Sequence, residues 1–251
     1  MMDLIPLLSS IPEQPTKAVR LLQRYMTIFQ RGDILMSKQQ NPPLVYEQIL
    51  ERIMNGTFAV GERIPESRLA VMLHVSRSPV HTALLQLAQD GLVTLCPNSS
   101  AHVACYSTQD LQDIGTLRLS LDDMAIRLAM LHGSRSDFLA LQKLAETCAQ
   151  GMRTGNNRLR RNADCDFHLL LAKISQNHLL FNFQTELYKR VNFILLTHQN
   201  AVVNCTAHIQ EHFELVDAIM QHDTALAHHI ITHHLASFYH LENLYPPEFL
   251  L

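Results

Sequence analysis

The sequence predicts a mainly α-helical chain in two folded parts, a short helix-turn-helix unit ending in a β-hairpin and an all-α helical bundle. Apolar residues recur at helical spacing through most of residues 44–91 and 109–243. Two short apolar runs, VTLC and HVACY, flank the turn-forming segment PNSSA between them. The chain has 251 residues, 47% of them apolar, and at roughly 100–200 residues per domain this length favours two domains with sizeable cores.

Composition narrows the class of protein further. The five cysteines are scattered and never form C-x-x-C, which favours reduced thiols in a cytoplasmic protein over a disulfide framework. The N-terminal segment lacks the basic region and cleavage site of a secretory signal. No run of 18 apolar residues occurs, so we expect no membrane span and no membrane partner.

Charge is distributed unevenly along the chain. Residues 1–43 carry a net charge of +2, residues 44–106 carry −1 and residues 107–251 carry −4. The first segment contains five prolines, and TKAVRLLQRYMTIF between them fits one amphipathic helix. We interpret residues 1–43 as an N-terminal appendage, with docking of this helix as its simplest role.

The predicted helix-turn-helix unit covers residues 44–106. A first helix runs from residue 44 and ends near Gly56, a second covers residues 66–73, and a third opens at Ser76, where serine can cap and the following Pro79 is tolerated. The third helix stops at Gly91 and the hairpin follows. This order of elements is typical of a winged helix, a DNA-binding fold.

A helix-turn-helix places its second helix in the major groove, with residues near the N-terminus of that helix facing the base edges. Arg77 can contact a guanine edge with two hydrogen bonds or hold a phosphate, and serine hydroxyls can bind phosphate oxygens. The candidate DNA-binding residues are Ser76, Arg77, Ser78, His81 and Thr82.

The remainder, residues 107–245, is predicted to be all-helical. Six helical patterns cover residues 109–132, 136–153, 157–175, 177–198, 207–221 and 223–243, with short connections between them. Such connections favour a bundle of antiparallel neighbours.

Histidines concentrate in this bundle, since 11 of the 15 lie at or after position 168. Asp164 and His168 share an apolar helix face, and His212 and His234 lie within the apolar stripes of two other helices. One carboxylate and three imidazoles suit Zn, Ni, Mn or Fe, with positions left open for water or an organic acid. Hydrogen-bonded core histidines, with Asp164 paired to a basic residue, are the alternative.

Arg118 is a second inward charge, because it falls on the apolar face of the helix at 109–132. Its guanidinium could bind a ligand carboxylate with two hydrogen bonds. It could equally form a structural salt bridge with Asp122, four residues later.

The first part resembles the GntR family of bacterial transcription regulators. The matching string is I53-x-x-G56-x-F58-x-x-G61, I64-x-E66-x-x-L69-A70, V75-S76-R77-S78-P79-V80 and G91-L92-V93. This chain departs from the family in having His81-Thr82 where Arg-Glu is usual. It also has Pro97-Asn98-Ser99-Ser100 where the wing commonly carries Arg and Gly. Both departures remove positive charge.

The second part resembles the FCD ligand-binding domain of the FadR-like branch of that family. The matching residues are D164-x-x-F167-H168, S175-x-N177-x-L179-L180, E211-H212 and H234-L235. The resemblance implies that Asp164, His168, His212 and His234 bind a divalent metal. Arg118, Leu121 and Asp122 also match the family's R-x-x-L-[DE] pattern, and Arg118 is the candidate effector-binding residue.

Together these observations predict a ligand-responsive regulator that binds double-stranded operator DNA as a homodimer. A small carboxylate effector would bind the metal and Arg118. A metal-dependent enzyme is the first alternative, although no general base with a motif around it is evident beyond scattered acids such as Asp166 and Glu214. An effector-binding protein whose DNA-binding domain is weakened, as His81-Thr82 and the neutral wing suggest, is the second.

Overall fold

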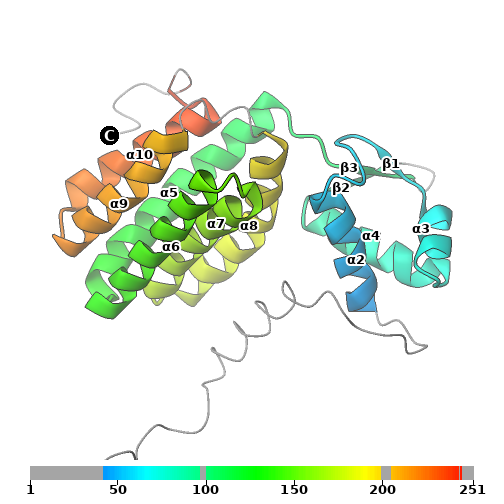
Figure 1. Cartoon of the computed structure of the whole chain (residues 1–251), viewed down its shortest axis with the longest axis horizontal. Coiled ribbons are helices and arrows are strands. Elements are labelled where there is room, and N and C mark those ends of the chain that lie inside the picture. Colours follow the sequence, from blue (N-terminus) through cyan, green and yellow to red (C-terminus); the bar gives the residue numbers. More distant parts are fainter. Residues whose placement is uncertain (1–41, 97–99, 199–204, 243, 245–251) are drawn as a thin grey trace, which may run out of the picture. The chain divides into compact units, whose positions relative to one another are not determined.

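The computed structural model describes residues 42–96, 100–198, 205–242 and 244 (Figure 1). The predicted N-terminal helix and the wing residues Pro97, Asn98 and Ser99 lie outside this range. The described chain is mainly α-helical, with a winged helix-turn-helix followed by an all-helical bundle, so the predicted fold class is confirmed.

The winged helix contains three helices and a small antiparallel sheet. In chain order its elements are α2 (Pro42–Met54), β1 (Arg63–Ile64), α3 (Glu66–Met72), α4 (Arg77–Gln89), β2 (Val93–Cys96) and β3 (Ser100–Val103). The strands lie in the order β1-β3-β2, with Ile64 opposite Ala101 and Thr94 opposite His102. Sequence analysis missed β1, because a strand of two residues has no periodicity to detect.

Local sequence explains the ends of these helices. Val45 and Ile49 are fully buried on one face of α2, four residues apart as one helix face requires. Gly91 has φ of +80° just after α4, a conformation that glycine adopts without steric cost. Ser76 occupies the N-cap position of α4, but its side chain makes no capping hydrogen bond, so the expected serine cap is wrong in that detail.

In the described part of the chain, the bundle is made of six helices, which are labelled in Figure 1. They are α5 (Thr108–His132), α6 (Arg135–Arg153), α7 (Asn157–Ile174), α8 (His178–Thr197), α9 (Cys205–Met220) and α10 (Thr224–Tyr239). Ser107 and Ser134 close capping boxes at α5 and α6, which satisfy backbone N–H groups that otherwise have no partner. Helix α10 ends four residues before the predicted 243, because His240 adopts the left-handed conformation.

The bundle core contains an unusual amount of polarity. Besides apolar residues such as Phe167, Leu171 and Ile231, the buried set in the described part of the bundle includes Arg118, Asp122, Arg161, His168, Ser175, Gln184, His212, Thr232 and His234. Burial of charged groups is unfavourable unless they are paired or bind a metal, so this interior is the candidate functional region of the bundle. Among the described residues, no helix has both the length and the hydropathy needed to cross a membrane.

Candidate metal centre

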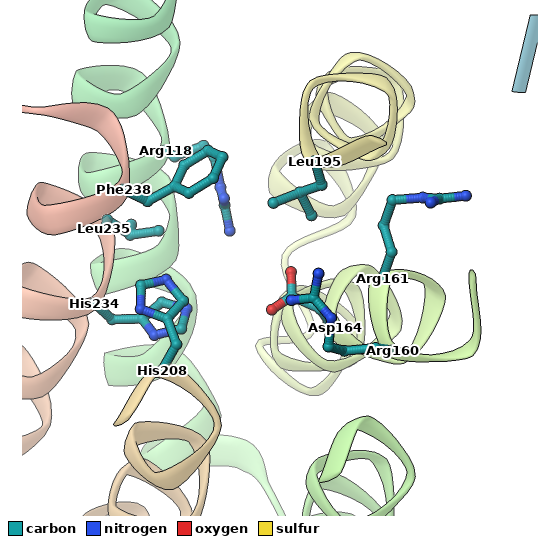
Figure 2. Close-up of a pocket in the computed structure, with 9 residues that line it drawn as sticks. All are labelled: Arg118, Arg160, Arg161, Asp164, Leu195, His208, His234, Leu235 and Phe238. Carbon is teal, nitrogen blue, oxygen red and sulfur yellow. The ribbon is translucent and has the colours of Figure 1, made fainter. Parts of the chain in front are cut away.

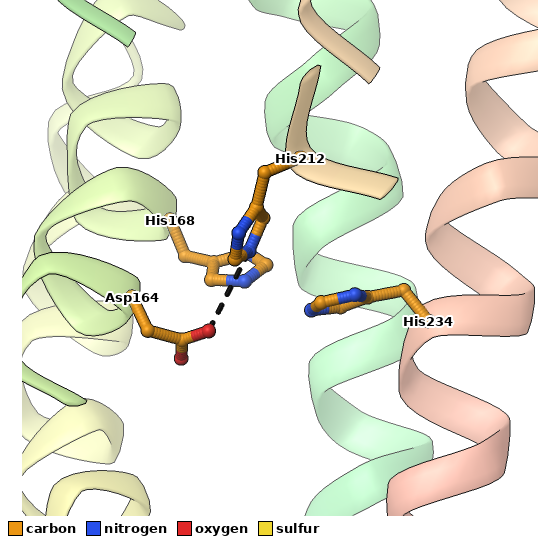
Figure 3. A group of neighbouring side chains, drawn as sticks. All are labelled: Asp164, His168, His212 and His234. Carbon is orange, nitrogen blue, oxygen red and sulfur yellow. Dashed lines mark ion pairs between the residues drawn. The ribbon is translucent and has the colours of Figure 1, made fainter. Parts of the chain in front are cut away.

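The four predicted metal ligands come together inside the bundle (Figure 3). Asp164 and His168 lie one turn apart on α7, His212 comes from α9 and His234 from α10. One potential ligand atom from each side chain lies within 4.8 Å of those of the others. The three imidazoles are buried, with His168 fully inaccessible, while Asp164 is half-buried.

The donor set fits a divalent metal because several buried ring nitrogens have no hydrogen-bond partner. Both nitrogens of His168 and both of His212 are buried without one, and His212 Nε2 lies 3.5 Å from Asp164 Oδ1 as an ion pair only. The alternative interpretation required hydrogen-bonded core histidines at His212 and His234. His234 meets that requirement through Glu211, whereas both ring nitrogens of His212 have no hydrogen-bond partner. Unsatisfied buried nitrogens are costly, and a metal ion in the cluster would satisfy one nitrogen of each ring.

Burial favours the neutral, metal-binding form of two of the imidazoles. Burial lowers the pKa of His212 to about 3 and also holds the pKa of His234 well below its usual value. Burial acts to raise the pKa of Asp164, but charge interactions with its neighbours, the Arg118 guanidinium among them, leave that pKa below its ordinary value. Neutral imidazoles and an ionised carboxylate are the forms that coordinate a cation.

Two further carboxylates lie next to the candidate ligand histidines His234 and His168. Glu211 Oε2 accepts a hydrogen bond from His234 Nδ1 at 2.9 Å, and its Oε1 accepts one from the exposed His233 at 2.7 Å. Asp122 Oδ2 lies 3.3 Å from His168 Nδ1. An ionised carboxylate can only accept, so Nδ1 of His234 carries the proton and its Nε2 is free for the cluster. Carboxylates that orient ligating histidines in this way are common around protein metals.

Sequence analysis considered Asp122 only as a partner of Arg118 and gave Glu211 no role, although two weak signals were present. Glu211 directly precedes the ligand candidate His212, and Asp122 follows Arg118 by one helical turn. Neither spacing reveals which histidine on another helix the carboxylate contacts.

Arg118 is buried, and two tyrosines and one carboxylate surround its guanidinium. Its Nη1 donates to Tyr239 Oη at 3.0 Å and its Nη2 donates to Tyr188 Oη at 2.6 Å, while Asp122 lies 3.4 Å away. The structural ion pair therefore exists. Arg118 Nε nevertheless remains buried without a partner, and the guanidinium lines a cavity beside the cluster.

This cavity has polar and charged walls (Figure 2). Its empty volume is about 380 Å³, a figure that includes open solvent at its mouth. Figure 2 shows Arg118 and His234 on one side and Asp164 and Arg160 on the other. The full lining is Arg118, Arg160, Arg161, Asp164, Leu195, His208, His234, Leu235 and Phe238.

The candidate DNA-binding residues lie at the start of α4. All five side chains, Ser76, Arg77, Ser78, His81 and Thr82, are exposed. His81 Nδ1 lies 3.0 Å from Glu66 Oε1, and Thr82 Oγ1 donates to the backbone oxygen of Ser78 at 3.2 Å. Arg77 forms no ion pair within the part of the chain that the structure describes, so its guanidinium is available for an anionic partner.

Two family models match these two regions. Residues 44–103 match the bacterial regulatory proteins of the gntR family, and residues 113–237 match the FCD domain. The chain belongs to the GntR family and carries an FCD domain. It is therefore a transcriptional regulator of the GntR/FCD type, and the prediction of a regulator rather than an enzyme is confirmed. Asp166 and Glu214, the acids considered for an enzyme, are both exposed.

Curated proteins that are similar to this chain are also named as transcriptional regulators or repressors. An uncharacterized HTH-type transcriptional regulator, YdhC of Bacillus subtilis, is 26% identical over 79% of this chain and 90% of its own length. A probable D-xylose utilization operon transcriptional repressor of Paenarthrobacter nicotinovorans is 28% identical over 77% of this chain and 85% of its own. The repressor NanR of Escherichia coli is 25% identical over 80% of this chain and 84% of its own length.

Solved structures support the fold. The E. coli protein McbR/YncC has 24% identity and a TM-score of 0.63, covering 80% of this chain and 99% of its own. A putative GntR transcriptional regulator from Rhodococcus sp. RHA1 has 18% identity and a TM-score of 0.69. The match covers 82% of this chain and 99% of the Rhodococcus chain. At this level of identity the likeness concerns the fold alone.

Proposed function

We propose that this regulator senses a small carboxylate through a divalent metal held by Asp164, His168, His212 and His234. The observation that carries the proposal is the set of buried imidazole nitrogens without hydrogen-bond partners at His168 and His212, facing an ionised Asp164. Three imidazoles and one carboxylate suit Zn, Ni, Mn or Fe, and one or more coordination positions would stay open for the ligand.

Arg118 is the residue proposed to bind the effector directly. Tyr188, Tyr239 and Asp122 hold its guanidinium in place, while Nε and one further N–H remain for a carboxylate at the cavity. A metal ion and a fixed guanidinium acting on the same carboxylate give strong, oriented, charge-assisted binding. The bound metal would supply a Lewis-acidic anchor for that group.

The winged helix, residues 44–106, is the proposed DNA-binding domain, and residues 107–245 form the proposed metal- and effector-binding domain. Arg77 would contact a base edge or phosphate, with Ser76, Ser78, His81 and Thr82 around it. Residues 44–106 contain four Lys+Arg, so a homodimer that doubles each contact supports affinity for operator DNA. Its place of action is accordingly the cytoplasm, where the DNA is.

The test begins by finding the DNA. Sheared genomic DNA of the source organism is incubated with the purified protein, and the retained fragments are sequenced. Fluorescence anisotropy then measures affinity for the most enriched fragment with metal-loaded protein, with chelator-treated protein and with Arg77→Ala. We expect an enriched site, a change in affinity on metal removal and a loss of affinity in Arg77→Ala. Absence of any enriched fragment at low salt would contradict the proposal.

A further inference from the structure

Helix α8 contributes side chains to the apolar cores of both folded parts. The winged helix and the bundle belong to one compact unit of the chain. Ile194 of α8 is fully buried in the core of the bundle, whereas its neighbour Phe193 is buried among the core residues of the winged helix. A displacement of α8 therefore changes the packing of both parts.

Toward the candidate metal centre, α8 holds groups that lie next to the predicted ligand-binding residues. Gln184 Nε2 donates to Asp122 Oδ1 at 2.6 Å, and Tyr188 Oη donates to Asp122 Oδ2 at 3.1 Å. The same tyrosine oxygen accepts a hydrogen bond from Arg118 Nη2 at 2.6 Å. Because Asp122 Oδ2 lies 3.3 Å from His168 Nδ1, a metal on His168 and a carboxylate on Arg118 would both act on side chains that are bonded to α8.

Toward the winged helix, the two residues that follow Tyr188 contact the end of α4. Arg190 Nη2 donates to the backbone oxygen of Gln89 at 2.9 Å, and Arg190 Nε donates to the backbone oxygen of Asp90 at 3.3 Å. Lys189 Nζ forms an ion pair with the buried carboxylate of Asp90 at 2.9 Å. The last carbonyl groups of a helix have no partner within the helix and carry partial negative charge. These two cations are therefore suited to hold α4 at its C-terminal end.

We infer that α8 couples the candidate metal centre to the DNA-reading helix α4, with Lys189 and Arg190 as the positioning residues that transmit the change. This inference rests on the proposed function and names the way in which its ligand site regulates DNA binding. Helix α4 has 13 residues, so Arg77 at its start lies about 20 Å from its end and moves with that end as part of one helix. A shift of Tyr188 thus alters the position of the side chains proposed to read DNA, and a ligand that favours one position changes the affinity for DNA.

Fluorescence anisotropy on the enriched DNA fragment tests this coupling, with the metal alone as the probe. The readout is the ratio of the dissociation constants of chelator-treated and metal-loaded protein. Coupling between two sites commonly changes affinity by about 5-fold to 150-fold, so we expect the wild-type ratio to differ from one by about fivefold or more, in either direction. The double variant Lys189→Gln with Arg190→Gln should bring the ratio close to one while elemental analysis shows the metal content of the wild type. Arg190→Lys keeps the charge without the two-pronged donor and should retain only part of the ratio.

Glu186→Gln is the matched control. Glu186 is the other carboxylate partner of Lys189, at 2.7 Å, but it is exposed and lies on α8 itself. Its replacement leaves the contacts with α4 in place and should preserve the ratio. Asp90→Asn removes the charge of the same ion pair from the side of α4 and should reduce the ratio. Thermal melting of each variant confirms folding.

Three results decide the inference. An unchanged ratio in the double variant would overturn it, even if both affinities fell equally, because Lys189 and Arg190 would then contribute only general positive charge. A ratio of one in wild-type protein that holds metal and binds the fragment would also overturn it, and the proposed metal site would stand. If the wild type holds no metal or enriches no fragment, the proposed function itself fails, and the inference fails with it.

Discussion

The winged helix and the bundle place their candidate functional groups in opposite ways. In the winged helix, the five side chains proposed to read DNA are neighbours in sequence and exposed at one end of α4. In the bundle, the four candidate metal ligands come from three helices, and the imidazoles are withdrawn from water. The first arrangement suits contact with a large external partner, and the second suits enclosure of a small ligand.

This difference has an energetic consequence. An exposed arginine such as Arg77 is solvated whether or not DNA is present, so its replacement should change binding with little effect on folding. The buried nitrogens of His168 and His212 are not solvated and have no hydrogen-bond partner. A metal ion that binds them would therefore stabilise the folded state. The bundle should therefore respond to its metal in stability as well as in function.

Metal removal is expected to have the largest effect. A metal present at about 1,000 times its dissociation constant adds about 4 kcal/mol of stability, so treatment with a chelator should lower the melting temperature of the protein. Differential scanning calorimetry with and without chelator measures this. The variant His168→Ala should melt at the same temperature in both conditions, because it has lost a ligand. If the chelator left the melting curve of the wild type unchanged, the expected effect of metal on the stability of the bundle would be contradicted.

Arg77→Ala should weaken operator binding by about 1–3 kcal/mol per half-site, since each protomer loses one contact to a base edge or phosphate. Fluorescence anisotropy on the enriched fragment measures the change. Arg127→Ala removes an exposed arginine of α5 that pairs with Asp123, and it should bind DNA as the wild type does. Equal losses in the two variants would indicate a general charge effect in place of recognition by α4.

Glu211→Ala should lower metal affinity about 10-fold to 100-fold, the usual effect of removing a carboxylate that orients a ligating histidine. Competition with a chromogenic chelator gives the affinity. Glu211→Gln keeps a hydrogen-bond acceptor for His234 Nδ1 and should recover part of the metal affinity. His233→Ala, which removes the exposed partner of the same carboxylate, should leave the affinity unchanged. Wild-type affinity in Glu211→Ala would show that Glu211 has no positioning role.

A last prediction concerns the packing behind Arg118 and the stability of the bundle. A Cβ added at Gly115 would lie 2.4 Å from Cβ of Tyr239, and Tyr239 accepts a hydrogen bond from Arg118. Gly115→Ala should therefore cost about 1–3 kcal/mol as overpacking, measured by urea unfolding. Ser120→Ala, at an exposed position of the same helix, is the control and should change stability little. Equal stability of the two variants would contradict the close approach of α5 and α10.

The same contrast explains what could be predicted from the sequence. Residues of the winged helix are close in sequence, so the spacing of Gly56, Pro79 and Gly91 placed its helices within a few residues. Helical periodicity also predicted which faces carry His212 and His234, because a face depends only on local spacing.

Partners across helices could not be predicted in this way. Nothing local relates Glu211 to His234, or Asp122 to His168, because those contacts depend on how α5, α7, α9 and α10 pack against each other. The cavity beside the cluster could not be predicted for the same reason, since it exists only once the helices are assembled. Strand β1 was missed because it gains its conformation by pairing with β3.

Elemental analysis of the purified protein tests the central claim most directly, namely that the bundle holds a divalent metal through its buried histidines. The wild type is compared with His212→Ala and with His229→Ala, whose histidine is exposed on α10. The account predicts one divalent metal ion per chain in the wild type and in His229→Ala, and its loss in His212→Ala. Wild-type protein without stoichiometric metal after growth and dialysis in metal-supplemented buffer, or full metal retention in His212→Ala, would contradict it.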